Sequence, residues 1–153
     1  MNRSSQHVQR GVGLIEVLVA VLILSIGLLG LAGLQMRTLR DNQSALDRSV
    51  AVVETHFIAD AMRADLNTAR TGGFNLAIAA ATPTASNFAT TALYHWRTNL
   101  VAALGTGATG GVACNGRVCS ITVQWNDSRA SSGSTANTNQ GAAEQTLVTE
   151  VYL

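Results

Sequence analysis

The chain has 153 residues, of which 47% are hydrophobic and only 12% are charged, and its formal net charge is +1. This length suits one domain, or one domain with a membrane segment, and it excludes a multidomain enzyme. The ten basic residues are all Arg and form no basic stripe that could follow a phosphate backbone, so we expect no direct binding of nucleic acid.

An apolar run near the N-terminus gives the strongest signal. It starts at Val12 and is interrupted only by Glu16, and residues 17–34 carry no charge. As a helix, residues 17–34 would be about 27 Å long, close to the roughly 30 Å hydrocarbon core of a bilayer. The sequence therefore predicts one membrane-spanning helix.

A short polar segment, residues 1–11, precedes this run and contains Arg3 and Arg10. Positively charged flanks stay on the cytoplasmic side of a membrane. We therefore expect a single-pass protein of the bacterial inner membrane whose C-terminal domain is periplasmic.

An ordinary secretory signal is the competing interpretation, because Gly30-Leu31-Ala32 is also a possible cleavage site after an apolar region. Glu16 argues against it. A carboxylate inside an apolar segment costs about 2.5 to 3.5 kcal/mol at the centre of the helix, and such residues are functional by default. A secreted binding module released after Ala32 stays open as an alternative.

Residues 11–20, GVGLIEVLVA, resemble the N-terminal signal of type IV prepilins and pseudopilins. The resemblance implies that residues 1–11 are a leader, that a prepilin peptidase cleaves after Gly11, and that the new N-terminus at Val12 is methylated. It also implies that Glu16 is the docking charge, which pairs with the terminal amine of a neighbouring subunit.

Beyond the membrane segment, helical periodicity continues without Pro or Gly from Gln35 to Thr71. The pattern predicts one helix over residues 12–70, with its membrane half at 12–35. We expect the outer half to pack on a small domain through an apolar face that contains Leu39, Leu46, Val50, Val53, Phe57, Ala61 and Leu66.

Residues 71–153 predict a small periplasmic α+β domain. A short helix over 91–104 has Trp96 as a core anchor, and strands are expected at 112–114, 118–126 and 145–153. Residues 127–143 are rich in Ser, Thr, Asn and Gly and predict a loop. The expected fold is type IV pilin-like: a long N-terminal helix packed on a small antiparallel sheet.

Two cysteines, Cys114 and Cys119, flank an Asn115-Gly116 turn signal. Two ligands alone make a poor zinc site, and a periplasmic compartment is oxidising. We therefore expect a disulfide between these two cysteines and no metal.

Enzyme chemistry needs polar groups that converge on one site, and the three histidines, His7, His56 and His95, are scattered along the chain. His56 and Asp60 lie four residues apart and could form half of a metal site. Residues 105–110 match G-x-G-x-x-G, but they follow a helix and precede a strand, the reverse of the dinucleotide-binding context. We expect no catalytic residue and no cofactor.

The helix with Trp96, the strand at 118–126, the terminal strand and the stretch 22–35 are similar to minor pilins of the PilV type. This resemblance implies a minor pilin of a type IV pilus (fimbrium), which supports pilus assembly, twitching motility and adhesion. The implied partners are prepilin peptidase, the major and other minor pilins, and the inner-membrane assembly platform. A pseudopilin of a type II secretion system has the same N-terminal features, so this function is kept as an alternative.

Overall fold

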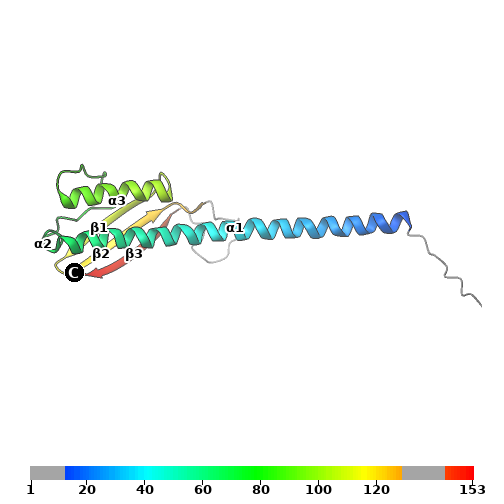
Figure 1. Cartoon of the computed structure of the whole chain (residues 1–153), viewed down its shortest axis with the longest axis horizontal. Coiled ribbons are helices and arrows are strands. Elements are labelled where there is room, and N and C mark those ends of the chain that lie inside the picture. The colour runs from blue at the N-terminus through cyan, green and yellow to red at the C-terminus, as the bar shows by residue number, and fades with distance from the viewer. Residues whose placement is uncertain (1–12, 129–143) are drawn as a thin grey trace, which may run out of the picture. The chain divides into compact units, whose positions relative to one another are not determined.

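The computed structural model describes residues 13–128 and 144–153. Along the chain these residues form α1 (Leu14–Ala64), α2 (Leu66–Arg70), α3 (Phe88–Leu104), β1 (Thr109–Asn115), β2 (Val118–Trp125) and β3 (Gln145–Tyr152) (Figure 1). The chain divides into two units, residues 1–38 and 39–153, and each is described by itself. The expected α+β fold, with a long N-terminal helix and a small antiparallel sheet, is confirmed.

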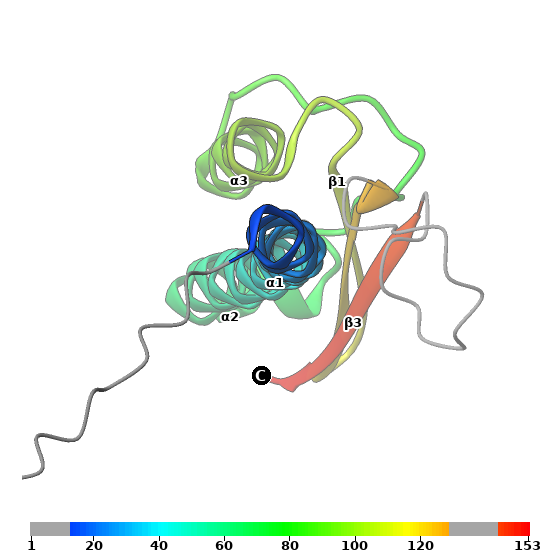
Figure 2. The same cartoon turned by 90° about the vertical axis from the view of Figure 1, so that its right-hand side faces the viewer.

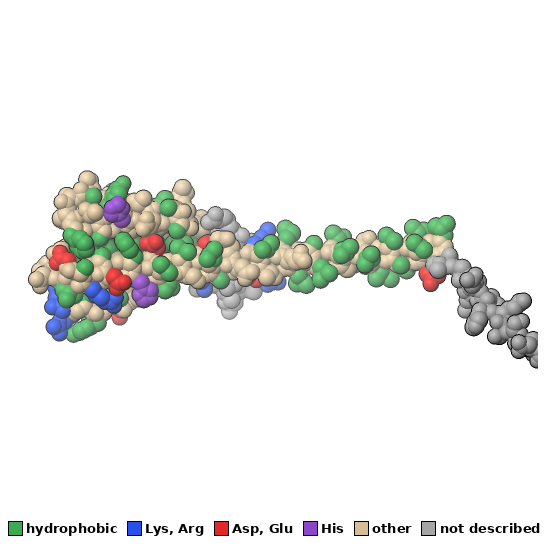
Figure 3. Space-filling model, viewed as in Figure 1, with side chains coloured by type: hydrophobic (Ala, Val, Ile, Leu, Met, Phe, Trp, Pro, Cys, Tyr) green, Lys and Arg blue, Asp and Glu red, His purple; other side chains and the backbone are tan. Residues whose placement is uncertain are grey.

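In the first unit, every described residue is exposed, and apolar side chains occupy nearly every position of the helix, as the visible face shows (Figure 3). By length and composition, α1 is apolar enough near its N-terminus to cross a membrane. A helix that is apolar all round has no preferred soluble face, so it needs a lipid or protein environment to cover it.

The helix predicted over residues 12–70 is divided near its C-terminal end. α1 ends at Ala64, and Asp65 caps α2, where its side chain accepts a hydrogen bond from Thr68 N at 3.2 Å. A capping Asp satisfies an N–H group at the start of a helix, which favours a new helix over a continuous one. This signal lies inside the helical pattern and was missed.

Most of the apolar face expected to pack on the domain is instead exposed, so this part of the prediction was wrong for most of its residues. Val53 is 64% exposed and Phe57 is 44% exposed, while Val50 and Ala61 are partly buried. The buried face of α1 consists of Ser44, Asp47, Ala51, Thr55, Ile58, Ala59 and Met62. Several of these side chains are small or polar, and Thr55 Oγ1 donates a hydrogen bond to Ala51 O of the same helix at 2.8 Å.

The sheet has the order β1-β2-β3, and both neighbouring pairs are antiparallel. The β1–β2 hairpin turns at Gly116, whose φ of 63° is the left-handed region that favours glycine. Alternate residues of β2 face the helices and are buried, as the sequence alternation predicted: Cys119, Ile121, Val123 and Trp125. The end-on view shows α1 and α3 on the same face of the sheet (Figure 2).

Trp96 of α3 lies at the centre of the core and is fully buried, as expected. A Cβ atom at Gly110 would lie 2.4 Å from its indole ring, so β1 can approach Trp96 only with glycine at this position. α3 starts at Phe88, three residues earlier than predicted, because Asn87 and Thr90 form a capping box. Within the 105–110 segment, Gly110 thus allows β1 to pack on Trp96, and Gly105 forms the C-cap of α3.

Candidate processing and assembly site

Glu16 lies in the first turn of α1, where its backbone N donates to Gly13 O at 3.0 Å. It is the only charged residue in the exposed stretch from Gly13 to Met36. The N-terminal end of a helix carries a partial positive charge that favours a carboxylate. Gly11 and Val12, the predicted processing residues, lie outside the described residues.

Residues 6–32 match the family model described as the prokaryotic N-terminal methylation motif. The match covers 27 of the 153 residues, so it describes the N-terminal segment and not the whole chain. It covers Gly11, Val12 and Glu16 and most of the apolar helix. No curated protein and no solved structure matches the chain.

The second unit has the disulfide expected between Cys114 and Cys119. The two residues are direct partners in the β1–β2 register, with Cα atoms 4.0 Å apart. Cys114 Sγ also lies 3.9 Å from Met62 Sδ of α1. The disulfide therefore links the two strands of the β1–β2 hairpin and lies in the core, next to α1.

Reduction of this disulfide should lower the free energy of unfolding by about 2 kcal/mol, since the chain-entropy model gives that value for so short a loop. The measurement is denaturant unfolding of the full chain in detergent, with and without reductant. The double variant Cys114→Ala/Cys119→Ala is the control and should respond identically in both conditions. Equal stability of oxidised and reduced wild type would contradict the prediction.

A buried cation that sequence reasoning missed holds the connection between α2 and α3. The Arg97 guanidinium donates to Gly110 O at 2.9 and 2.6 Å, to Ala77 O at 2.8 Å and to Ile78 O at 3.2 Å, and it also donates to Ala80 O. Burial lowers the pKa of this group. Carbonyl oxygens satisfy its donors, so Arg97 fixes an irregular segment to β1 and α3.

Replacing Arg97 with Met should reduce the free energy of unfolding by about 2 to 4 kcal/mol, because several buried carbonyl groups then lose their donor. Thermal or denaturant unfolding measures the loss. Arg63→Met is the matched control: Arg63 is exposed and its pair with Asp60 at 2.7 Å should contribute less than about 1 kcal/mol. A similar loss in both variants would show that Arg97 has no special structural role.

The polar segment predicted at 127–143 begins with a residue that the structure buries. Asp127 is 2% exposed and accepts a hydrogen bond from Ser44 Oγ at 2.6 Å. This hydrogen bond links α1 to the segment that directly follows β2. Residues 129–143 lie outside the described residues, so the rest of the predicted loop stays a prediction.

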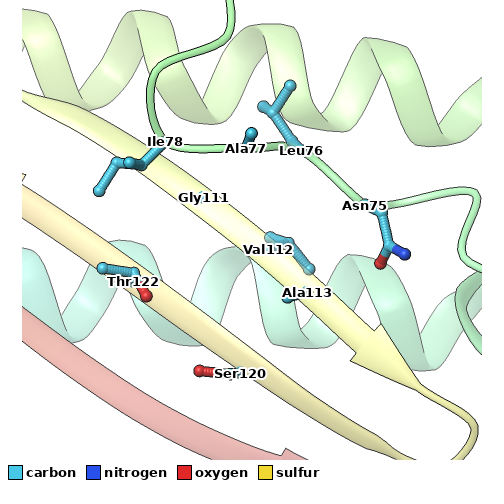
Figure 4. A pocket seen from close by; sticks show the side chains of 9 residues that line it. All are labelled: Asn75, Leu76, Ala77, Ile78, Gly111, Val112, Ala113, Ser120 and Thr122. Atoms are coloured by element: carbon cyan, nitrogen blue, oxygen red, sulfur yellow. The ribbon is translucent and has the colours of Figure 1, made fainter.

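The hollows of the second unit differ in the side chains that line them, and one of them includes both Asp60 and His95. Another hollow, of about 470 Å³, is lined by Ser120 and Thr122 of β2, by Gly111 of β1 and by the segment Leu76–Ile78. Figure 4 shows these residues from close by. The lining of this hollow has hydroxyl and amide groups but no titratable side chain. Among the described residues, no group of three His, Cys, Asp or Glu side chains could hold a metal ion.

Proposed function

We propose that the chain is the precursor of a minor pilin of the PilV type, incorporated into a type IV pilus and supporting its assembly, motility and adhesion. Three features support this proposal: the methylation motif, the exposed apolar helix, and the small α+β unit with its disulfide. The single observation that carries it is Glu16, an acid placed inside the apolar part of the matched motif.

In this proposal, prepilin peptidase removes residues 1–11 as a leader and the new terminus at Val12 is methylated. Residues 12–35 cross the inner membrane once, the helical segment continues through the end of α1 at Ala64 and through α2 to Arg70, and residues 71–153 form the periplasmic domain. During assembly, the apolar helix leaves the membrane through the inner-membrane platform and packs among the major and other minor pilins.

Glu16 supplies the docking charge in this account. When the helix moves into the filament, its carboxylate pairs with the terminal amine of a neighbouring subunit. Two opposite charges about 4 Å apart attract by roughly 4 kcal/mol at an effective dielectric of about 20, before the cost of desolvation. The pair therefore favours one axial register between subunits.

Fractionation of the producing bacterium tests the function. Wild-type protein should be recovered both in the inner membrane and in pili sheared from the cells, and deletion of prepilin peptidase should remove it from the pili. Recovery in the secretion-system pseudopilus alone would support the pseudopilin alternative. Recovery as a soluble secreted protein would contradict both.

A further inference from the structure

The three-stranded sheet has two edges, and the described residues close only one of them. On the β1 edge, Leu76 N donates to Val112 O at 2.8 Å, and Val112 N donates to Leu76 O at 2.9 Å. On the opposite edge, β3 has β2 as its only strand partner among residues 13–128 and 144–153.

The register shows which backbone groups of β3 point to this outer edge. Leu153 N donates to Arg117 O at 2.7 Å, so these two residues form a hydrogen-bonded pair at the end of the β2–β3 ladder. Such pairs alternate along an antiparallel ladder, and this register continues without a bulge to Gln145. The outward N–H and C=O groups therefore belong to Thr146, Val148, Glu150 and Tyr152.

The outer edge of β3 lacks the usual devices that prevent strand pairing. Its eight residues contain no Pro, Lys or bulge and only one charge, Glu150. On the outer face of the sheet, Val148 is 57% exposed and Tyr152 is 68% exposed. On the inner face, Leu147 and Val151 are only partly buried. An exposed strand edge with so little protection is a template for another strand.

We propose that the outer edge of β3 binds an extended strand donated by a different subunit of the filament. Main-chain hydrogen bonds to Val148 and its outward neighbours give the affinity, and apolar side chains of the added strand cover Leu147 and Val151. The proposal rests on the proposed function, because it requires a neighbouring subunit.

A second copy of this chain fits the edge poorly. Its β1 edge is already closed by Leu76, so it could offer only its own β3. Two β3 strands that pair antiparallel are related by a twofold axis perpendicular to the sheet. This rotation would also reverse the direction of α1. Helices anchored in one membrane run in the same direction, so such a pair does not fit. Parallel in-register pairing would place Glu150 beside Glu150, and like charges in neighbouring strands are destabilising.

Val148→Pro separates strand pairing from folding. Proline removes an N–H group that points outward, so the β2–β3 ladder keeps its hydrogen bonds, and proline is tolerated on edge strands for this reason. Recovery of Val148→Pro in sheared pili should fall about 5- to 160-fold, since one lost backbone bond between subunits costs about 1 to 3 kcal/mol. Val148→Ala keeps the N–H and should be recovered nearly as wild type.

Three outcomes are decisive for this comparison. Equal recovery of Val148→Pro and wild type overturns the strand pairing. A loss in Val148→Ala as large as in Val148→Pro also overturns it, because the side chain and not the backbone would then be responsible. Absence of wild type from the pili refutes the proposed function itself.

Amide hydrogen exchange of the isotope-labelled wild-type chain tests the pairing without a variant. In detergent, the amides of Thr146, Val148, Glu150 and Tyr152 should exchange fast, while those of Leu147, Thr149 and Val151 are protected by β2. In the pilus, all seven should be protected. Protection of the four outward amides already in detergent would mean that the chain closes its own edge, and fast exchange in the pilus would mean that no strand is added. Either result overturns the proposal.

Discussion

The variant Glu16→Gln should enter the inner membrane and be processed as wild type, yet its recovery in sheared pili should fall about 100-fold or more. The substitution keeps the size of the side chain and removes its charge, so insertion becomes easier. In the filament, the amine of the neighbouring subunit is left unpaired among apolar helices, which costs about 3 to 5 kcal/mol in buried pairs.

The measurement is the ratio of variant protein in the pilus fraction to variant protein in the inner membrane. Ser25→Ala is the matched control in the same helix, because Ser25 Oγ donates to Val21 O of its own helix at 2.7 Å and should need no partner in the filament. Normal recovery of Glu16→Gln would show that Glu16 is not the docking charge.

Replacing Gly11 with Val should give a nearly complete block of processing. The family resemblance places peptidase cleavage after Gly11, and a larger side chain at this position should prevent it. The unprocessed chain keeps the polar segment 1–11 on its helix, so we expect it to stay in the inner membrane and to be absent from the pili.

Immunoblots of membrane and pilus fractions detect the larger precursor. Gly13→Ala is the control, because a Cβ atom there would meet only Ile15 Cγ2 at 3.9 Å, an ordinary van der Waals distance. This variant should be cleaved and assembled. Cleavage of the Gly11→Val chain at the normal site would refute the assigned position.

The elements of the fold could be predicted because their signals are local. The apolar run predicted the long N-terminal helix, alternation along residues 118–126 predicted β2, and Asn115-Gly116 between two cysteines predicted the hairpin and its disulfide. Periodicity also identified a helix around Trp96, although that helix begins at Phe88, three residues earlier than expected.

The orientation of α1 could not be predicted in the same way. The sequence has an apolar row that includes Leu39, Leu46 and Val53, and hydrophobicity alone favours its burial. The structure instead buries small and polar residues such as Ser44 and Ala51. Their burial depends on contacts with distant parts of the chain, and no local pattern indicates such contacts.

Arg97 and Asp127 were missed for the same reason. An Arg in a helix and an Asp after a strand are usually exposed, but Arg97 is buried against the carbonyl groups of Gly110 and of 77–80, and Asp127 is buried beside the hydroxyl of Ser44. In the candidate site, by contrast, Glu16 was recognisable from the sequence, because a charge within an apolar run stands out without knowledge of the fold.

Mass spectrometry of the mature protein, taken from sheared pili, tests the central claim most directly. The account predicts a chain that begins at Val12, carries one additional methyl group on its terminal amine and retains the whole apolar helix. A chain that begins at Gly33, or an intact chain beginning at Met1 in cells that contain prepilin peptidase, would contradict it.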